Sequence, residues 1–343
     1  MRLTNDATSQ SAPLVSAILC TYNRASLLGC ALGALCAQTL GREQFEVIVI
    51  DDGSTDQTAA VAERFADLLR LRYAYQDNSG LAAAKNHGVC LARGEIVVFV
   101  DDDDVLDSRC LQAHYETHQR HPAVADAVLG FTGLAAGPGR SPLMRYVTEV
   151  GCQLFYYPHL KHDAKLDYSF FWGGRSSCKR RLLLEHGVFN PVFRFGAEDI
   201  ELGYRLRSVG LRVIYNANAI SYMMRTLSFD DFCRRCYLQG RSNQVFATLH
   251  PQREVQAWAQ LKGIEAEWRL IEPRFDLLMQ SGRKLDRFAT ERSRVDLPLD
   301  KLSTQLLHRA YAAAFTANRI RGSIDMQGEA PVSAGRSDAG IAA

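Results

Sequence analysis

The chain has 343 residues, of which 23% are charged and 47% hydrophobic, and its formal net charge at pH 7 is +2. This is the composition of an ordinary soluble globular protein with room for one to three domains. The small net charge gives no reason to expect nucleic acid as a partner. Nine cysteines are scattered without the spacing of a disulfide framework, which indicates a reducing cytoplasm.

The first 13 residues are polar, and we expect them to form a flexible N-terminus that lacks the apolar core of a signal peptide. No run of about 18 apolar residues is present, so no membrane-spanning helix is expected. We therefore expect a cytoplasmic protein. Peripheral contact with the inner face of a membrane stays open, because a missing anchor does not exclude work at a membrane surface.

Apolar runs and helical periodicities alternate regularly between residues 14 and 104. Strands are expected at 14–20, 45–50, 71–75 and 95–100, and helices at 24–38, 56–69 and 80–92. Such alternation implies right-handed βαβ units in a doubly wound sheet. The sequence thus predicts an α/β protein with a mixed, mainly parallel sheet flanked by helices.

The rest of the chain is less regular. A helix is expected at 105–120, a Gly- and Pro-rich loop at 134–142, a mixed aromatic-rich stretch at 143–195, a helix at 199–209 and a strand at 211–215. Strand signals then vanish. From about 228 to 323 the pattern predicts two or three amphipathic helices, broken near Pro251, Pro273 and Pro298, and residues 324–343 read as a disordered tail.

Two acidic clusters follow directly after buried strands. Asp51-Asp52-Gly53-Ser54-Thr55-Asp56 follows the run 45–50, and Asp101-Asp102-Asp103-Asp104 follows the run 96–100. Ligands of open α/β sheets bind beyond the carboxyl ends of the strands, so both clusters should face one crevice. Four consecutive aspartates also need a compensating charge. A divalent cation that holds substrate phosphates would supply it.

Three further segments have a functional and a purely structural interpretation. Thr21-Tyr22-Asn23-Arg24 ends the first strand in groups that can bind a base and ribose, or that cap the next helix. Lys85 can meet a diphosphate or be an ordinary exposed helix lysine. Trp172-Gly173-Gly174 can stack on a sugar ring or form a core turn.

Glu198 and Asp199 open a predicted helix. A carboxylate at a helix N-terminus is stabilised as the anion, which is the form that a general base needs. The alternative is a helix cap without a catalytic role.

The order of these segments resembles that of the family 2 glycosyltransferases, which have a GT-A fold. The resemblance covers about residues 14–225. It rests on Thr21-Tyr22-Asn23-Arg24, Asp51-Asp52-Gly53-Ser54-Thr55-Asp56, Gly80-Leu81-Ala82-Ala83-Ala84-Lys85-Asn86, residues 92–104, Trp172-Gly173-Gly174, and residues 198–206.

The resemblance implies a role for each of these positions. It assigns the nucleotide-sugar donor to Thr21, Tyr22, Asn23, Arg24, Asp52, Lys85, Asp101 and Asp102. It assigns the acceptor to Trp172, Gly173, Gly174 and Glu198. Asp103, in the family's DXD signature, would hold Mn²⁺ or Mg²⁺, and Asp199 would be the catalytic base.

The resemblance also implies a division of the chain. Residues 14–226 would form the GT-A catalytic domain, with a nucleotide-binding half at 14–104 and an acceptor half at 105–226. Residues 227–323 would form a helical C-terminal region.

Two positions depart from the family pattern. Met223 stands where relatives often carry a metal-ligating histidine after the last core strand, and hard cations bind thioethers poorly. Coordination is therefore expected to rest on Asp103, the diphosphate and water, and a histidine at 223 is expected to tighten it. Arg175 stands where many relatives have asparagine, which leaves acceptor specificity open.

From this resemblance we expect metal-dependent transfer of a sugar, with inversion, from a nucleotide-sugar to a hydroxyl of a saccharide or lipid-linked acceptor. UDP is the expected nucleotide, and cell-surface polysaccharide or glycoconjugate synthesis is the expected context. The sequence does not predict the oligomeric state.

Three alternatives remain at this stage. One is a sugar-nucleotide pyrophosphorylase, although Cys20-Thr21-Tyr22-Asn23 is not the Gly-rich basic loop that such an enzyme needs. Another is a catalytically inactive nucleotide-binding module, which Met223 favours and intact Asp103 and Asp199 disfavour. The third is a helical scaffold function in residues 228–323.

The C-terminal helices carry spaced basic residues: Arg234, Arg235, Arg241, Arg283, Lys284 and Arg287. We expect these helices to dock on the catalytic domain and to help receive the acceptor or an anionic membrane surface. A solvated basic face is the alternative.

Overall fold

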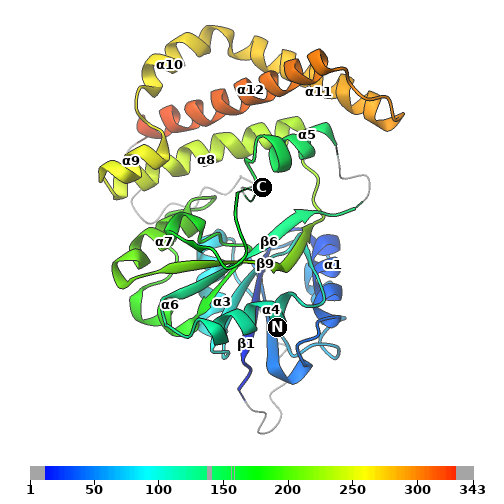
Figure 1. Cartoon of the computed structure of the whole chain (residues 1–343), viewed down its shortest axis with the longest axis vertical. Coiled ribbons are helices and arrows are strands. Elements are labelled where there is room, and N and C mark those ends of the chain that lie inside the picture. Colours follow the sequence, from blue (N-terminus) through cyan, green and yellow to red (C-terminus); the bar gives the residue numbers. More distant parts are fainter. Residues whose placement is uncertain (1–11, 137–140, 156, 158, 330–343) are drawn as a thin grey trace.

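The computed structural model describes residues 12–136, 141–155, 157 and 159–329, and Figure 1 shows the arrangement of its elements. Within these residues nine strands form one mixed sheet in the order β3-β2-β1-β4-β8-β6-β9-β5, with β7 beside β9. The strands are β1 (Val15–Thr21), β2 (Phe45–Asp51), β3 (Leu71–Tyr75), β4 (Ile96–Asp101), β5 (Asp104–Leu106), β6 (Asp126–Leu134), β7 (Lys165–Leu166), β8 (Ser176–Lys179) and β9 (Arg212–Met223).

The first four strands are parallel and form the core of residues 14–104. Strands β1, β2 and β4 are buried along nearly their whole length, as continuous apolar runs predict. Six helices of the described residues accompany the sheet: α1 (Ala25–Cys36), α2 (Thr58–Glu63), α3 (Leu81–Leu91), α4 (Cys110–Arg120), α6 (Arg180–His186) and α7 (Glu198–Leu206). The short α5 (Pro142–Arg145) lies instead against the C-terminal helices. The sheet and its six helices confirm the predicted α/β fold with a mixed sheet flanked by helices.

Residues 105–226 depart from the sequence prediction in several elements. Strand β8 pairs antiparallel with both β4 and β6, and β6 runs parallel to β9. Neither β6 nor β8 was predicted. The helix expected at 105–120 begins only at Cys110, because β5 precedes it and pairs with β9. The strand expected at 211–215 continues to Met223, and the helix expected at 56–69 ends at Glu63.

The C-terminal region contains five helices instead of two or three: α8 (Phe229–Leu249), α9 (Arg253–Ala259), α10 (Ile264–Ile271), α11 (Phe275–Arg294) and α12 (Lys301–Gln327). The additional break lies at Gln260 and Gly263, which both have left-handed backbone conformations. Helix α12 ends at Gln327 and therefore includes the first residues of the predicted tail. Residues 1–11 and 330–343, which belong to the termini expected to be flexible, lie outside the described residues. Residues 137–140 of the loop predicted at 134–142 also lie outside them.

Helix α8 lies along the sheet domain, α10, α11 and α12 lie on its far side, and α9 packs against α7 (Figure 1). Helix α8 crosses α12 at two glycines. A Cβ atom at Gly240 would lie 1.9 Å from the Arg319 carbonyl oxygen, and one at Gly322 would lie 1.9 Å from the Tyr237 carbonyl oxygen. The two backbones are therefore in direct contact. No helix in the described part of the chain is long and apolar enough to cross a membrane.

Candidate active site

The acidic clusters meet at the carboxyl ends of the parallel strands, as the sequence predicts. Thr21, the last residue of β1, is in register with Asp51 of β2, and Cys20 is in register with Asp101 of β4. Asp51 accepts hydrogen bonds from the Ser54 backbone N–H and the Tyr73 hydroxyl, at 2.7 and 2.6 Å. Asp51 therefore shapes the turn after β2.

Asp52 is nearly buried and lies against the loop that follows β3. Its carboxylate accepts hydrogen bonds from the backbone N–H groups of Ser79 and Gly80, both at 2.9 Å, and from the Gln76 side chain at 2.8 Å. Asp52 thus fixes the loop that leads into α3. Its contact with a nucleoside stays a prediction.

Asn23 and Arg24 connect the first strand to both acidic clusters. Asn23 has a left-handed backbone, and its side chain accepts a hydrogen bond from the Thr55 N–H at 2.8 Å. The Arg24 guanidinium lies 2.8 Å from Asp102 and 3.8 Å from Asp103. Part of the charge that compensates the aspartates therefore comes from the chain itself.

The four consecutive aspartates differ in their surroundings. Asp104 is buried and accepts a hydrogen bond from the Ser221 hydroxyl at 2.8 Å, which makes it part of the sheet structure. Asp103 lies at the crevice with 12% of its side chain exposed. Burial, Asp101 and Asp102 raise the pKa of Asp103 to about 6, although Arg24 and Arg225 oppose the shift. The field at Asp103 is thus negative enough to favour a cation.

The residues at Asp103 fit a hard cation that takes most of its ligands from elsewhere. Carboxylate oxygens are the ligands that Mg²⁺ and Mn²⁺ prefer, and Mg²⁺ is often held by one or two carboxylates plus substrate phosphates. Among the described residues no three His, Cys, Asp or Glu side chains gather in a metal-binding group. A cation here would need oxygens from the donor and from water.

Lys85 and Asn86 on α3 hold the segment that precedes α7. The Lys85 ammonium is buried and lies 2.8 Å from the Glu198 carboxylate. Asn86 exchanges two hydrogen bonds with the backbone of Phe189, at 2.8 and 2.9 Å. Burial opposes the charge of Lys85, but Glu198, Asp199 and Asp101 outweigh it and raise the pKa of this lysine.

This placement bears on two expected roles. Lys85 is expected to contact donor phosphates and Glu198 to contact the acceptor, yet each is nearly buried and is engaged with the other. Their observed contact holds α7 against the nucleotide-binding half. Direct contact of either with a ligand stays a prediction.

Asp199 is held at the start of α7 by two backbone donors. Its carboxylate accepts hydrogen bonds from the N–H groups of Gly173 and Ile200, both at 2.8 Å. Burial and Glu198 raise the pKa of Asp199 to about 6, while Lys85 and the two N–H groups limit the shift. At neutral pH the group is mostly ionised, yet its pKa is close enough to 7 for proton transfer.

The segment from Trp172 to Arg175 separates Asp199 from Asp101. A Cβ atom at Gly174 would lie 1.9 Å from the Asp101 carboxylate, and one at Gly173 would lie 2.3 Å from the Lys85 nitrogen, so neither position tolerates a side chain without a shift. Arg175 lies 3.3 Å from Asp101 and over the Phe155 ring. The predicted glycines thus lie between the two carboxylates, with Gly173 against Asp199 and Gly174 against Asp101.

Trp172 is half-buried on the same segment. Its ring packs against Tyr157 and Phe170, and its indole N–H donates to the Ser169 carbonyl at 2.8 Å. These contacts hold the ring in one orientation. Stacking on a sugar stays a prediction for the part of the ring that is exposed.

Met223, expected to stand in place of a metal-ligating histidine, is 8% exposed and packs in the hydrophobic core. Its relation to a metal stays a prediction. The backbone of Met224 donates to the Asp103 carbonyl at 2.8 Å, and it is Arg225, the next residue, whose charge acts on Asp103. A match to the family pattern identifies a position in the sequence but not the direction in which its side chain points.

Sequence reasoning did not assign Arg225 and Arg235 to the crevice. Arg235 projects from α8 with its guanidinium 5.3 Å from the Phe195 ring, and the charges acting on it include Arg175, Asp101 and Asp103. Within the described residues neither Arg225 nor Arg235 makes an ion pair. Two guanidiniums that make no ion pair in the described residues, and whose charges interact with Asp103, suit an anionic ligand. Arg225 could have been found from its place just after a strand end.

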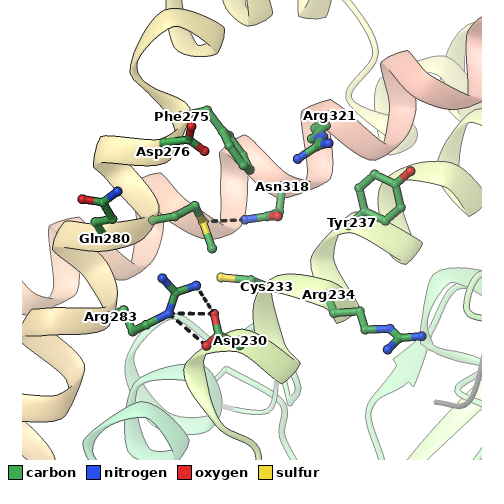
Figure 2. Close-up of a pocket in the computed structure, with 11 residues that line it drawn as sticks. Asp230, Cys233, Arg234, Tyr237, Phe275, Asp276, Gln280, Arg283, Asn318 and Arg321 are labelled. Atoms are coloured by element: carbon green, nitrogen blue, oxygen red, sulfur yellow. Dashed lines mark hydrogen bonds and ion pairs between the residues drawn. The ribbon is translucent and has the colours of Figure 1, made fainter.

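The other basic residues of the helical region have different surroundings. Arg283 forms an ion pair with Asp230 in a pocket of about 520 Å³ between α8, α11 and α12, which Arg234 also lines (Figure 2). Arg241 pairs with Glu329, and Arg287 pairs with Glu291. The basic residues expected to form one face therefore have different surroundings. Arg241, Arg283 and Arg287 form ion pairs within the chain, Arg234 lines the pocket, and the charge of Arg235 interacts with Asp101 and Asp103.

A mixed sheet of this order, with acidic clusters at strand ends and a carboxylate at the start of α7, is the arrangement of the GT-A fold. The model of the family "Glycosyl transferase family 2" matches residues 16–186. The chain belongs to the family 2 glycosyltransferases.

Relatives and solved structures agree with this assignment. Validoxylamine A glucosyltransferase of Streptomyces hygroscopicus subsp. jinggangensis is 34% identical over 222 residues, which are 58% of this chain and 52% of that protein. The chain thus spans about half the length of this relative.

Two solved structures share the fold. TarS 1-349 of S. aureus in complex with UDP-GlcNAc matches with a TM-score of 0.52 and 18% identity over 93% of both chains. The mannosyltransferase PcManGT of Pyrobaculum calidifontis, in complex with GDP-Man and Mn²⁺, matches with a TM-score of 0.56 and 21% identity over 90% of this chain and 87% of that chain.

Proposed function

We propose that this chain is an inverting glycosyltransferase that moves a sugar from a UDP-sugar to a hydroxyl of a saccharide or lipid-linked acceptor. We further propose that it acts in the synthesis of cell-surface polysaccharide or glycoconjugate. The observation that carries this assignment is the position of Asp199, held by two N–H donors and separated from Asp101 only by the Gly173-Gly174 segment.

In the proposed reaction Asp199 takes the proton of an acceptor hydroxyl. The acceptor oxygen then forms a bond to the anomeric carbon as the bond from that carbon to the diphosphate oxygen breaks on the opposite face. Gly173 and Ile200 orient the carboxylate through their N–H groups. No carboxylate nucleophile is required, which is why inversion is expected.

The departing diphosphate gains negative charge, and Arg225 and Arg235 are suited to offset it. The charges of the carboxylate cluster act on both guanidiniums, and neither makes an ion pair in the described part of the chain. A divalent cation at Asp103, when bound, would act as a Lewis acid on the leaving diphosphate. The solved complexes with UDP-GlcNAc and with GDP-Man and Mn²⁺ support this combination by analogy of fold.

Calorimetry with UDP tests the donor site. We expect Asp103→Ala to lose the part of UDP binding that depends on Mn²⁺ and to leave the fold intact. Asp107→Ala, which removes a carboxylate just after β5, is the control. Equal metal-dependent affinity in wild type and Asp103→Ala would contradict the metal assignment. Donor hydrolysis with Mn²⁺ separates an active enzyme from an inactive nucleotide-binding module.

A further inference from the structure

The connection between α11 and α12 exposes large apolar side chains. Phe288 is 49% exposed, Val295 63%, Leu297 51%, Leu302 75% and Leu306 53%. Single exposed apolar residues are common on soluble proteins, whereas a contiguous group usually marks a contact surface. We call these five residues the apolar tip.

The spacing of the apolar tip makes it contiguous. Phe288 lies in the last two turns of α11, Val295 directly follows that helix, and Leu302 and Leu306 are one turn apart at the start of α12. Helices α11 and α12 pack against each other, and Figure 1 shows their connection projecting from one end of the helical layer. All five residues lie within about 10 Å of this connection along the helix axes.

Basic side chains surround the apolar tip. Residues 284–309 contain six Lys or Arg residues and four Asp or Glu residues. Three of the acidic side chains are engaged within the fold: Glu291 pairs with Arg287, Asp300 caps α12, and Asp286 accepts a hydrogen bond from the Tyr311 hydroxyl.

Four basic side chains around the apolar tip are exposed and make no ion pair with a described residue: Lys284, Arg294, Lys301 and Arg309. They give the outward face of the tip a positive charge. An anionic surface would therefore attract it.

These features favour a lipid surface over a second copy of the chain. Pairing two tips would bring their positive rims together. Interfacial helices, by contrast, place Leu and Phe at the acyl boundary and Lys and Arg at anionic headgroups. We propose that the apolar tip docks the protein on an anionic membrane surface.

Vesicle co-sedimentation tests this docking without donor or acceptor, so its outcome is independent of the proposed transferase activity. The wild-type chain is expected to bind vesicles of phosphatidylcholine and phosphatidylglycerol at low salt, and to bind phosphatidylcholine alone much more weakly. Leu302→Ser/Leu306→Ser should weaken binding at least about tenfold, since each leucine loses its transfer into the acyl boundary.

A matched control uses two leucines of similar exposure on the catalytic domain. Leu68 is 56% and Leu184 is 52% exposed, and Leu68→Ser/Leu184→Ser is expected to bind vesicles as the wild type does. Arg294→Glu/Lys301→Glu should abolish the salt-sensitive part of binding and keep the same thermal unfolding.

Three results would overturn the inference. The wild type could fail to bind anionic vesicles at low salt, or both leucine pairs could reduce binding equally. Size-exclusion chromatography could instead reveal a dimer that only Leu302→Ser/Leu306→Ser dissociates, which would make a second copy the occupant. UDP affinity in the same preparations shows separately whether the donor site is intact.

Discussion

Asp199→Asn is expected to reduce catalysis and at the same time to change the pH dependence of stability. In the wild type the native pKa of Asp199 is about 6, above the ordinary value of 3.8. An acid with a raised native pKa binds its proton more tightly when folded. Ionising it therefore lowers the free energy of unfolding as pH rises from about 4 to 6.

The size of this effect follows from the shift. A rise from 3.8 to about 6 corresponds to about 3 kcal/mol at 1.36 kcal/mol per pKa unit, and solvent at this half-buried group reduces it to roughly 2–3 kcal/mol. Asparagine carries no charge, so the mutant avoids this cost. It retains an acceptor for only one of the two N–H groups of Gly173 and Ile200, which costs about 1–3 kcal/mol at every pH.

Urea unfolding of both proteins between pH 4 and pH 8 measures the difference. The stability of Asp199→Asn relative to the wild type should rise by roughly 2–3 kcal/mol over this range, whatever the pH-independent cost. Asp167→Asn, at an exposed cap of a short helix, is the control. A difference that does not change with pH would refute the assigned environment of Asp199.

The same pair of proteins tests catalysis. The sugar-transfer rate of Asp199→Asn should fall by roughly 10²–10⁴-fold, because asparagine cannot accept a proton. In the wild type kcat/KM should fall about tenfold per pH unit below pH 6 as the base becomes protonated. Turnover within a few-fold of the wild type would make another carboxylate, such as Glu198, the base.

Arg235→Ala should weaken UDP binding by about tenfold in calorimetry. Arg234→Ala, which changes the neighbouring residue on the side of α11, should leave UDP binding unchanged. Equal effects of the two substitutions would show that Arg235 does not bind the donor. Lys85→Met should destabilise the fold by about 3–5 kcal/mol in urea unfolding because it leaves Glu198 buried without a partner, and Lys85→Met/Glu198→Gln should recover much of this loss. Met223→His should lower stability by about 1–3 kcal/mol and leave the Mn²⁺ titration of activity unchanged; tighter Mn²⁺ use would restore Met223 to the metal site.

The parallel half of the sheet could be predicted because each strand is a continuous apolar run followed by a turn signal. Strand β8 could not, because its residues Ser176 and Ser177 read as a loop. In the structure Ser177 is buried and hydrogen-bonds His114 and His118 of α4, about 60 positions earlier in the chain. Strand β6 was hidden by Gly130 and Gly133, which break its apolar pattern.

The candidate site shows the same division. Asp103 and Asp199 follow from local signals, since one lies after a strand and the other begins a helix. The partner of Lys85 does not, because Glu198 is more than 100 positions away and only the tertiary fold brings the two side chains together. The position of Arg235 depends on how α8 lies on the catalytic domain, and the sequence of α8 alone does not determine this.

The direct backbone contact between α8 and α12 has a consequence for exchanging parts between relatives. Arg235 belongs to the crevice, yet the helix that carries it is positioned by Gly322, almost 90 residues further along the chain. A chimaera joined after β9 would graft a foreign α8 onto this crevice and alter its charge, even with every aspartate retained. A junction beyond Gln327 would transfer the crevice and its supporting helix as one unit.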